Sequence, residues 1–162
     1  TFSTNNIATT GVHQTTFGGG EGNGDTFIAK FNTNGVRLWG TYYGGNQGEF
    51  GSAIAVDGSG NVYVCGNTSS SNAIATAGAH QTTFGGDIDA FIVKFTTNGV
   101  RLWGTYYGSF GWDQGIGIAV DGGGNVYITG ETSSFNAIAT AGAHQTTYGG
   151  GFRDAFIAKF ST

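Results

Sequence analysis

Short stretches of alternating apolar and polar side chains recur along the chain, and most end in glycine, asparagine or aspartate. In residues 90–95 (AFIVKF), two phenylalanines and a valine fall on one face, and an isoleucine and a lysine fall on the other. This two-residue period is typical of a β-strand. The predicted strands of one unit are 53–57, 61–66, 90–95 and 100–107. The long segment 68–88 is too polar and too rich in glycine to form an amphipathic helix, so the sequence predicts an all-β fold.

The turns between these strands have the residues that tight turns require. Asp57-Gly58-Ser59-Gly60 separates the first two strands, and Thr96-Thr97-Asn98-Gly99 separates the last two. Glycine adopts positive φ at little cost, and aspartate and asparagine side chains bond to their own backbone. One unit is therefore predicted to run strand, strand, long loop, strand, strand.

The chain repeats itself at a fixed interval. A motif that begins with Gly51 returns at Gly115, and GVRLWGTYYG begins at Gly35 and again at Gly99, so both motifs recur at the same shift. A loop motif HQTT, followed by an aromatic residue and two glycines, occurs three times, and each copy precedes a DxFIxKF strand. The 162 residues thus hold about 2.5 repeats of about 64 residues.

A four-stranded antiparallel sheet of this size cannot bury both of its faces, so the units must stack. A β-propeller suits a unit of this length better than a solenoid does, because solenoid coils are usually shorter. The small first strand is predicted to lie innermost and the aromatic fourth strand outermost. Residues 1–50 are then a partial blade with a long loop and the third and fourth strands, residues 51–114 a complete blade, and residues 115–162 a partial blade with the first three strands.

The motifs resemble a known bacterial family, the SBBP repeats named for seven-bladed β-propellers. The resemblance rests on AIAVDGSGNVYVCG, GAHQTTFGGDIDAFIVKF and GVRLWGTYYG, which together recur over nearly the whole chain. The loop departs from the family's proline-containing pattern, because residues 72–80 read NAIATAGAH and the chain has no proline. Repeats with this ending resemble those of large surface proteins exported by the type IX route. The resemblance therefore implies a secreted or cell-surface location, and it implies no reaction.

Composition and charge exclude several classes of protein. The chain has 32 glycines and only 10% charged residues, but 38% hydrophobic and 14% aromatic residues argue against disorder. The formal net charge is −4 and the basic residues are scattered, so nucleic acid is not an expected partner. No apolar run is long enough for a membrane span, and no signal peptide is visible. Because the first residue is Thr1, we expect the numbering to begin inside a longer or processed precursor.

Several residues could carry chemistry, and each has a structural interpretation as well. The three loop histidines could form a ring of metal ligands, but blades hold equivalent atoms far apart, so contacts with neighbouring backbone are favoured. Asp57 and its repeat Asp121 could be calcium ligands, but the glutamate that completes a calcium loop is missing, which favours a turn-forming role. The single cysteine, Cys65, is expected to be a small buried side chain. The histidines are His13, His80 and His144, and the carboxylates that precede the third strands are Asp25, Asp89 and Asp154.

An enzyme would be expected to break the repeat, because a catalytic site needs one asymmetric set of groups. The residues that differ between units are Glu21, Cys65, Asn67 with its repeat Glu131, Phe110, Trp112, Phe135, Phe152 and Arg153. They include no recognisable set of nucleophile, base and orienting acid. We therefore predict a protein that is not an enzyme, with no catalytic, metal or cofactor site. A hydrolase that depends on a carboxylate such as Glu49 or Asp113 is a distant third hypothesis.

The predicted function is structural. The incomplete outer sheets should expose apolar faces and unpaired strand edges. Either the residues are part of a longer array of blades, or copies of the chain complete one another's sheets and form a ring or a filament. The expected partners are thus further blades or other copies, with adhesion as an added role. A module that binds glycans or proteins is the second hypothesis, because Trp39, Trp103 and Tyr107 with its neighbours could stack on sugars.

Overall fold

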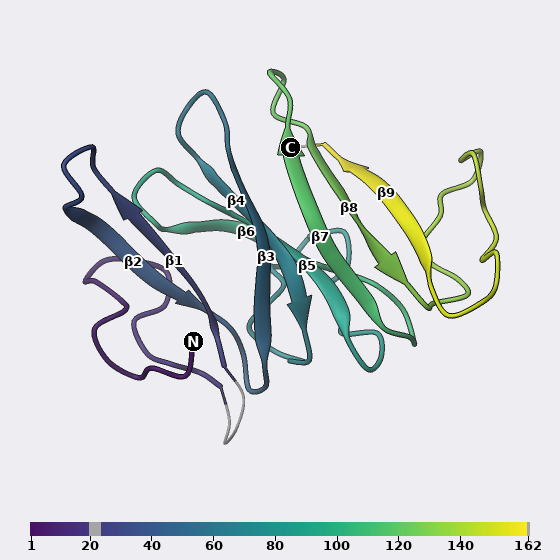
Figure 1. The fold of residues 1–162 in the computed structure, drawn as a ribbon, viewed down its shortest axis with the longest axis horizontal. Helices are drawn as coiled ribbons and strands as arrows, with labels where there is room; N and C mark the ends of the chain where they lie inside the picture. Colours follow the sequence, from purple (N-terminus) through teal and green to yellow (C-terminus); the bar gives the residue numbers. More distant parts are fainter. Residues whose placement is uncertain (20–23, 162) are drawn as a thin grey trace.

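The computed structural model describes residues 1–19 and 24–161, and this part of the chain folds into three twisted antiparallel sheets placed side by side (Figure 1). It contains nine strands and no helix. The sheets have the strand orders β1-β2, β3-β4-β5-β6 and β7-β8-β9, and we refer to them as the first, middle and third blades. The strands are β1 (Thr26–Phe31), β2 (Arg37–Tyr43), β3 (Glu49–Val56), β4 (Val62–Thr68), β5 (Asp89–Phe95), β6 (Arg101–Tyr107), β7 (Asp113–Val120), β8 (Val126–Thr132) and β9 (Asp154–Phe160). The all-β prediction and the order of strands within a unit are confirmed.

The first strand of a blade begins earlier than the sequence pattern indicated. In β3, Glu49 and Phe50 already pair with β4, ahead of the expected start at Ala53. The register then shifts between Gly51 and Ala53, which is a bulge. This irregularity interrupts the alternation of side chains, so the pattern was visible only on its C-terminal side. Gly115 and Gly117 produce the same shift in β7.

The middle blade has a packed core on each of its two faces. Phe91, Val93 and Phe95 of β5 point toward the first blade, where they pack with Ile28 and Tyr43. Ile92 of β5 points the other way and packs with residues of the third blade. The alternation in 90–95 therefore separates two interfaces rather than a core and a solvent side, which is why the strand has almost no polar residues.

Neighbouring blades meet most closely through their first strands. β7 contacts β3, β4 and β5 of the middle blade, and in Figure 1 β3 and β7 lie near the centre of the row of sheets. Within the described ranges the three sheets do not close into a ring. No helix in this part of the chain is long and apolar enough to cross a membrane.

Candidate functional site

The two outer blades expose apolar side chains that the middle blade buries at the equivalent positions. Phe27 of β1 is 50% exposed, whereas its counterpart Phe91 is fully buried. Ile157 of β9 is 82% exposed, whereas its counterpart Ile92 is fully buried. We call these two surfaces the end faces. They are exposed because each outer blade has a neighbour on one side only.

A groove lies beside the end face of the first blade, along the free edge of β1. It has a volume of about 390 Å³ and is lined mainly by residues 26–29 of β1 and 49–54 of β3. In the middle blade the equivalent edge of β5 is paired with β4. The groove therefore occupies the place that a second strand fills in a complete blade.

A second group of exposed aromatic residues has a different origin. Phe110, Phe135 and Phe152 are 79%, 80% and 84% exposed. Their counterparts one repeat earlier are also exposed, but these are polar residues. The three counterparts are Asn46, Ser71 and Asp87. These phenylalanines are thus additions to surface loops and not the result of a missing neighbour.

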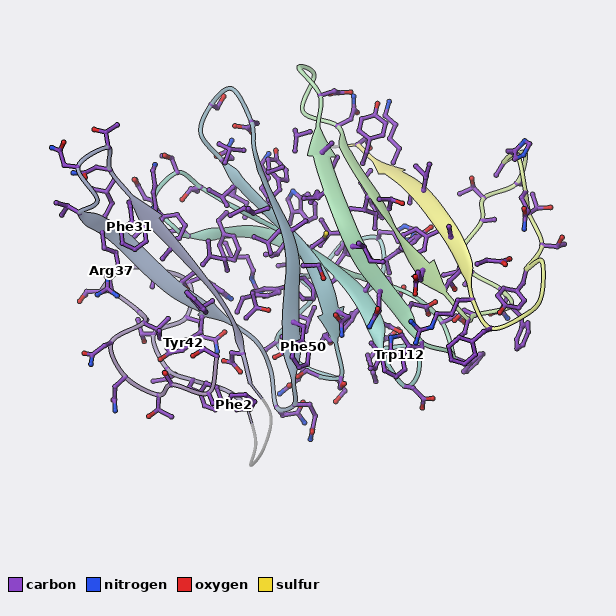
Figure 2. All side chains as sticks on the ribbon, viewed as in Figure 1. Phe2, Phe31, Arg37, Tyr42, Phe50 and Trp112 are labelled. Carbon is purple, nitrogen blue, oxygen red and sulfur yellow. The ribbon has the colours of Figure 1, made fainter. Side chains whose placement is uncertain are left out.

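Arg153 joins this group to Trp112 and Glu131, two more residues that break the repeat. Its guanidinium carbon lies 4.8 Å from the ring centre of Trp112 and 5.1 Å from that of Phe152. Its Nη1 donates to Glu131 Oε2 at 2.8 Å. Figure 2 places Trp112 at the lower ends of the blades, close to where β7 begins. We call Trp112, Glu131, Phe152, Arg153 and the adjacent Phe110 and Phe135 the rim cluster.

The structure does not bring every repeat-breaking residue into this cluster. Cys65 lies in β4 within the core between the middle and third blades, and burial raises the pKa of its thiol to about 11. The thiol is therefore protonated and a poor nucleophile at neutral pH. Asn67 is buried in β4. Glu21 lies outside the described residues.

The HQTT motif holds the long loop against its own blade through the glutamine. Gln81 Nε2 donates to Asp89 Oδ2 at 3.0 Å, and Gln81 Oε1 accepts from the backbone N–H of Gly108 at 3.0 Å. The backbone of Gln81 also bonds to Thr105 and Tyr106 in β6. The sequence interpretation quoted the motif but gave this residue no role. Its recurrence in each repeat, 8 to 11 residues before an aspartate, was the available signal.

Two buried carboxyl groups meet at each junction between blades. A Cβ placed on Gly108 would lie 2.6 Å from Asp89 Oδ1 and 2.8 Å from Asp113 Oδ2, so these two oxygens border the same small space. A Cβ on Gly44 would likewise touch Asp25 and Glu49. Larger side chains would clash with the carboxylates, which explains glycine at both positions.

The carboxyl groups of Asp89 and Asp113 have different hydrogen-bond partners. Asp113 accepts hydrogen bonds from Ser109, Thr132 and Ser134, whereas Asp89 Oδ1 has no hydrogen-bond partner. Burial raises the pKa of Asp89 to about 6; hydrogen bonds from Gly85 and Gln81 oppose this rise, and the nearby Asp113 carboxylate adds to it. Burial also raises the pKa of Glu49. Glu49 and Asp113 occupy equivalent positions in consecutive repeats, so they do not break the repeat as the hydrolase hypothesis assumed.

Each of two loop histidines packs on aromatic rings where blades meet. The ring of His13 lies 5.9 Å from Tyr43 and from Phe95, and its backbone N–H donates to Gly99. His80 is 5.9 Å from Tyr107 and 5.5 Å from Phe160. Burial and the nearby Arg101 guanidinium lower the pKa of His13 to about 4. The two rings sit in different junctions and serve packing. In the described residues, no three His, Cys, Asp or Glu side chains are grouped as metal ligands would be.

The aspartates of the first hairpins form turns. Asp57 Oδ1 accepts from the backbone N–H groups of Ser59 and Asn61 at 2.9 Å, and Oδ2 accepts from Asn61 and Tyr63 side chains. These bonds, led by that from the Asn61 side chain, hold the pKa of Asp57 below its usual value. Asp121 accepts the equivalent bonds from Gly123, Asn125 and Tyr127 in the third blade. The turn interpretation of both residues agrees with this geometry.

The comparisons with known proteins agree with the fold. Residues 38–72 and 102–136 match the SBBP family, described as a beta-propeller repeat, and each match runs from a fourth strand into the first two strands of the next blade. A 109-residue stretch is also 29% identical to the WD repeat-containing protein L264 of Acanthamoeba polyphaga mimivirus. That match covers 65% of the chain and only 8% of the viral protein. These two stretches of the chain are thus similar to beta-propeller repeats of the SBBP family.

Proposed function

We propose that the chain is a structural, non-enzymatic segment of a longer array of blades in a secreted or cell-surface protein. The observation that carries this proposal is the contrast between Ile157, 82% exposed, and Ile92, fully buried at the same position of the middle blade. Burying one isoleucine side chain that was exposed to water stabilises a fold by about 1.5–3 kcal/mol. The end faces are therefore complementary to further blades of the same kind.

The open strand edges favour further blades of the same precursor over a second copy of this segment. The first blade holds the third and fourth strands of its unit, and the third blade holds the first three. Two segments joined end to end would bring two third strands to one sheet, so one of them would have to be released. A blade supplied by a continuing array has no such surplus strand, and it would fill the groove beside β1.

An added repeat tests this proposal. A second copy of residues 51–114 is inserted between Gln114 and Gly115, and unfolding is followed in urea. In a stacked array each inserted unit adds one more interface between blades, so the midpoint should rise. The same insertion with Asp at the position of Ile92 in the added copy should remove most of the gain. An unchanged midpoint in the first variant would mean that the three blades need no further neighbour, and the proposal would fail.

Glycan binding by the aromatic fourth strand has less support. Tyr43, Tyr106 and Tyr107 are buried, and their hydroxyls donate to the carbonyls of Ile74, Ser70 and Ile138 at 2.7–2.9 Å. Their rings pack between blades and offer no free face to a sugar. Trp39 is buried as well, and its Nε1 donates to Thr97.

A further inference from the structure

We propose that the rim cluster is a docking surface for another protein, whose contact region is apolar at the centre and basic at its edge. This role goes beyond the proposed array, because the three phenylalanines of the cluster lie on loops and not on an end face. Specific recognition requires residues that repetition does not provide, and the cluster consists of six repeat-breaking residues, of which Arg153 contacts three.

The three phenylalanines of the rim cluster would stay exposed in a continuous array. The counterparts of Phe135 and Phe152 lie in the middle blade, which has neighbours on both sides, and the counterpart of Phe110 lies where the first blade connects to it; all three are exposed. The counterpart of the end-face residue Ile157 is buried under the same conditions. Addition of blades would thus cover Ile157 and leave the phenylalanines in water, so array packing does not explain them.

The surface is held in place by its backbone and by Arg153. The N–H of Trp112 donates to Ser133 Oγ at 2.8 Å, and that of Gly111 donates to Ser134 Oγ at 3.0 Å. These bonds fix the segment with Phe110 beside the loop that carries Phe135. Arg153 contacts both Trp112 and Phe152, while Glu131 fixes its guanidinium. Ordering the surface before binding lowers the entropy cost of association.

The chemistry favours a protein partner over a glycan. Phenylalanine rings have no polar group, and they are stabilised most by burial against other apolar side chains. The guanidinium of Arg153 and the carboxylate of Glu131 already bond to each other, so they are poorly placed to hydrogen-bond sugar hydroxyls. Tryptophan, phenylalanine and arginine in one patch are the composition of the energetic centre of a protein interface.

The charges beside the cluster indicate which charge the edge of the partner's contact region should carry. Glu131 balances Arg153, and Asp87 adds an exposed negative charge nearby, since it follows Gly86, which packs on the backbone of Phe110. The chain as a whole has a net charge of −4. Lysine or arginine on the partner would therefore be attracted, whereas an acidic edge would be repelled.

The test uses the whole chain as bait for random linear peptides displayed on phage, with an array of immobilised glycans probed in parallel. The key variant restores the middle-repeat residues, Phe110→Asn, Phe135→Ser and Phe152→Asp, which the same backbone positions already accommodate as Asn46, Ser71 and Asp87. Ile157→Asp is the matched control on the end face. We expect selected peptides to be apolar and basic, and to bind the triple variant at least about tenfold more weakly than the parent. Their affinity for the Ile157→Asp variant should be unchanged.

Three results would overturn the proposal: no peptide is enriched, the selected peptides bind the triple variant as well as the parent, or only glycans bind and lose affinity in that variant. Thermal unfolding of the triple variant checks that any loss of binding is local, and its midpoint should match that of the parent. The outcome is separate from the array proposal, which depends on Ile157 and Ile92 and not on the phenylalanines.

Discussion

The middle and third blades have nearly the same loop sequence, NAIATAGAHQTT at 72–83 and 136–147, but the two loops are supported differently. In the middle blade, β6 bonds to the loop backbone at Thr76 and Gln81, and the ring of His80 packs on Tyr107. In the third blade, which has three strands in the described residues, Thr140 and Gln145 are exposed, whereas Thr76 and Gln81 of the middle blade are half-buried. The exposure of the same sequence therefore depends on the strands beside it, and not on the local sequence alone.

The strands of the two blades lead to the same conclusion, because β5 packs on both faces whereas β9 packs on one. This difference gives the largest predicted effect. Ile92→Ala should lower the free energy of unfolding by about 2–5 kcal/mol, because the cavity forms between two packed blades. Ile157→Ala should change it by less than about 0.5 kcal/mol. Urea unfolding of both variants is the measurement, and equal losses would mean that Ile157 is also covered in solution.

The pair Asp89 and Asp113 should make stability depend on pH. The pKa of Asp89 is raised from 3.8 to about 6 in the folded chain, so the folded state binds more protons than the unfolded state between these values. The free energy of unfolding should then fall by up to about 3 kcal/mol as pH rises from about 4 to about 6. Above that range, Asp89 should contribute little further change. Buffered urea titrations would measure this slope.

The variant Asp89→Asn should flatten the slope, because its amide does not titrate and can donate toward Asp113. Asp154→Asn is the control, since Asp154 is the counterpart of Asp89 but no following carboxyl group stands beside it in the described residues. An undiminished slope in Asp89→Asn would assign the pH dependence to other groups, of which Asp25 and Glu49 have raised pKa values too.

The hydrogen bonds of the glutamine in the HQTT motif should contribute to stability only where a fourth strand supports the loop. Gln81→Ala leaves the N–H of Gly108 without its partner and removes one of the two donors to Asp89 Oδ2, the other being the N–H of Gly85, so it should destabilise the fold by about 2 kcal/mol. Gln145 is exposed, and its side chain bonds to Thr147 and Asp154, so Gln145→Ala should cost less than about 0.5 kcal/mol. Thermal unfolding compares the two, and a large loss from Gln145→Ala would show that the third loop is held as firmly as the second.

These contrasts also show what the sequence could predict. The strands, their order and the hairpin turns follow from alternation and turn chemistry, which are local, and the regular interval between motifs shows that the units stack. The carboxyl pair could not be predicted, because Asp89 and Asp113 meet only when two blades pack. The rim cluster was visible as a set of differences between repeats, but its members lie in the loop before β7, in strand β8 and in the long loop between β8 and β9. Only the folded chain places Arg153 between Trp112 and Phe152.

The smallest predicted effect concerns the backbone of the two loops. Ala73 and Ala137 both have φ of 64°, a left-handed conformation that is unfavourable for alanine, and Asn6 has the same φ at the equivalent place in the first repeat. Asparagine tolerates this conformation better, so Ala73→Asn should stabilise the fold by about 0.5–1 kcal/mol. The gain should be smaller for Ala137→Asn, because a loop with few contacts can relax its strain before the chain unfolds. Denaturant midpoints of the two variants measure the difference; equal gains would mean that both loops are equally constrained, in which case the fourth strand is not what orders them.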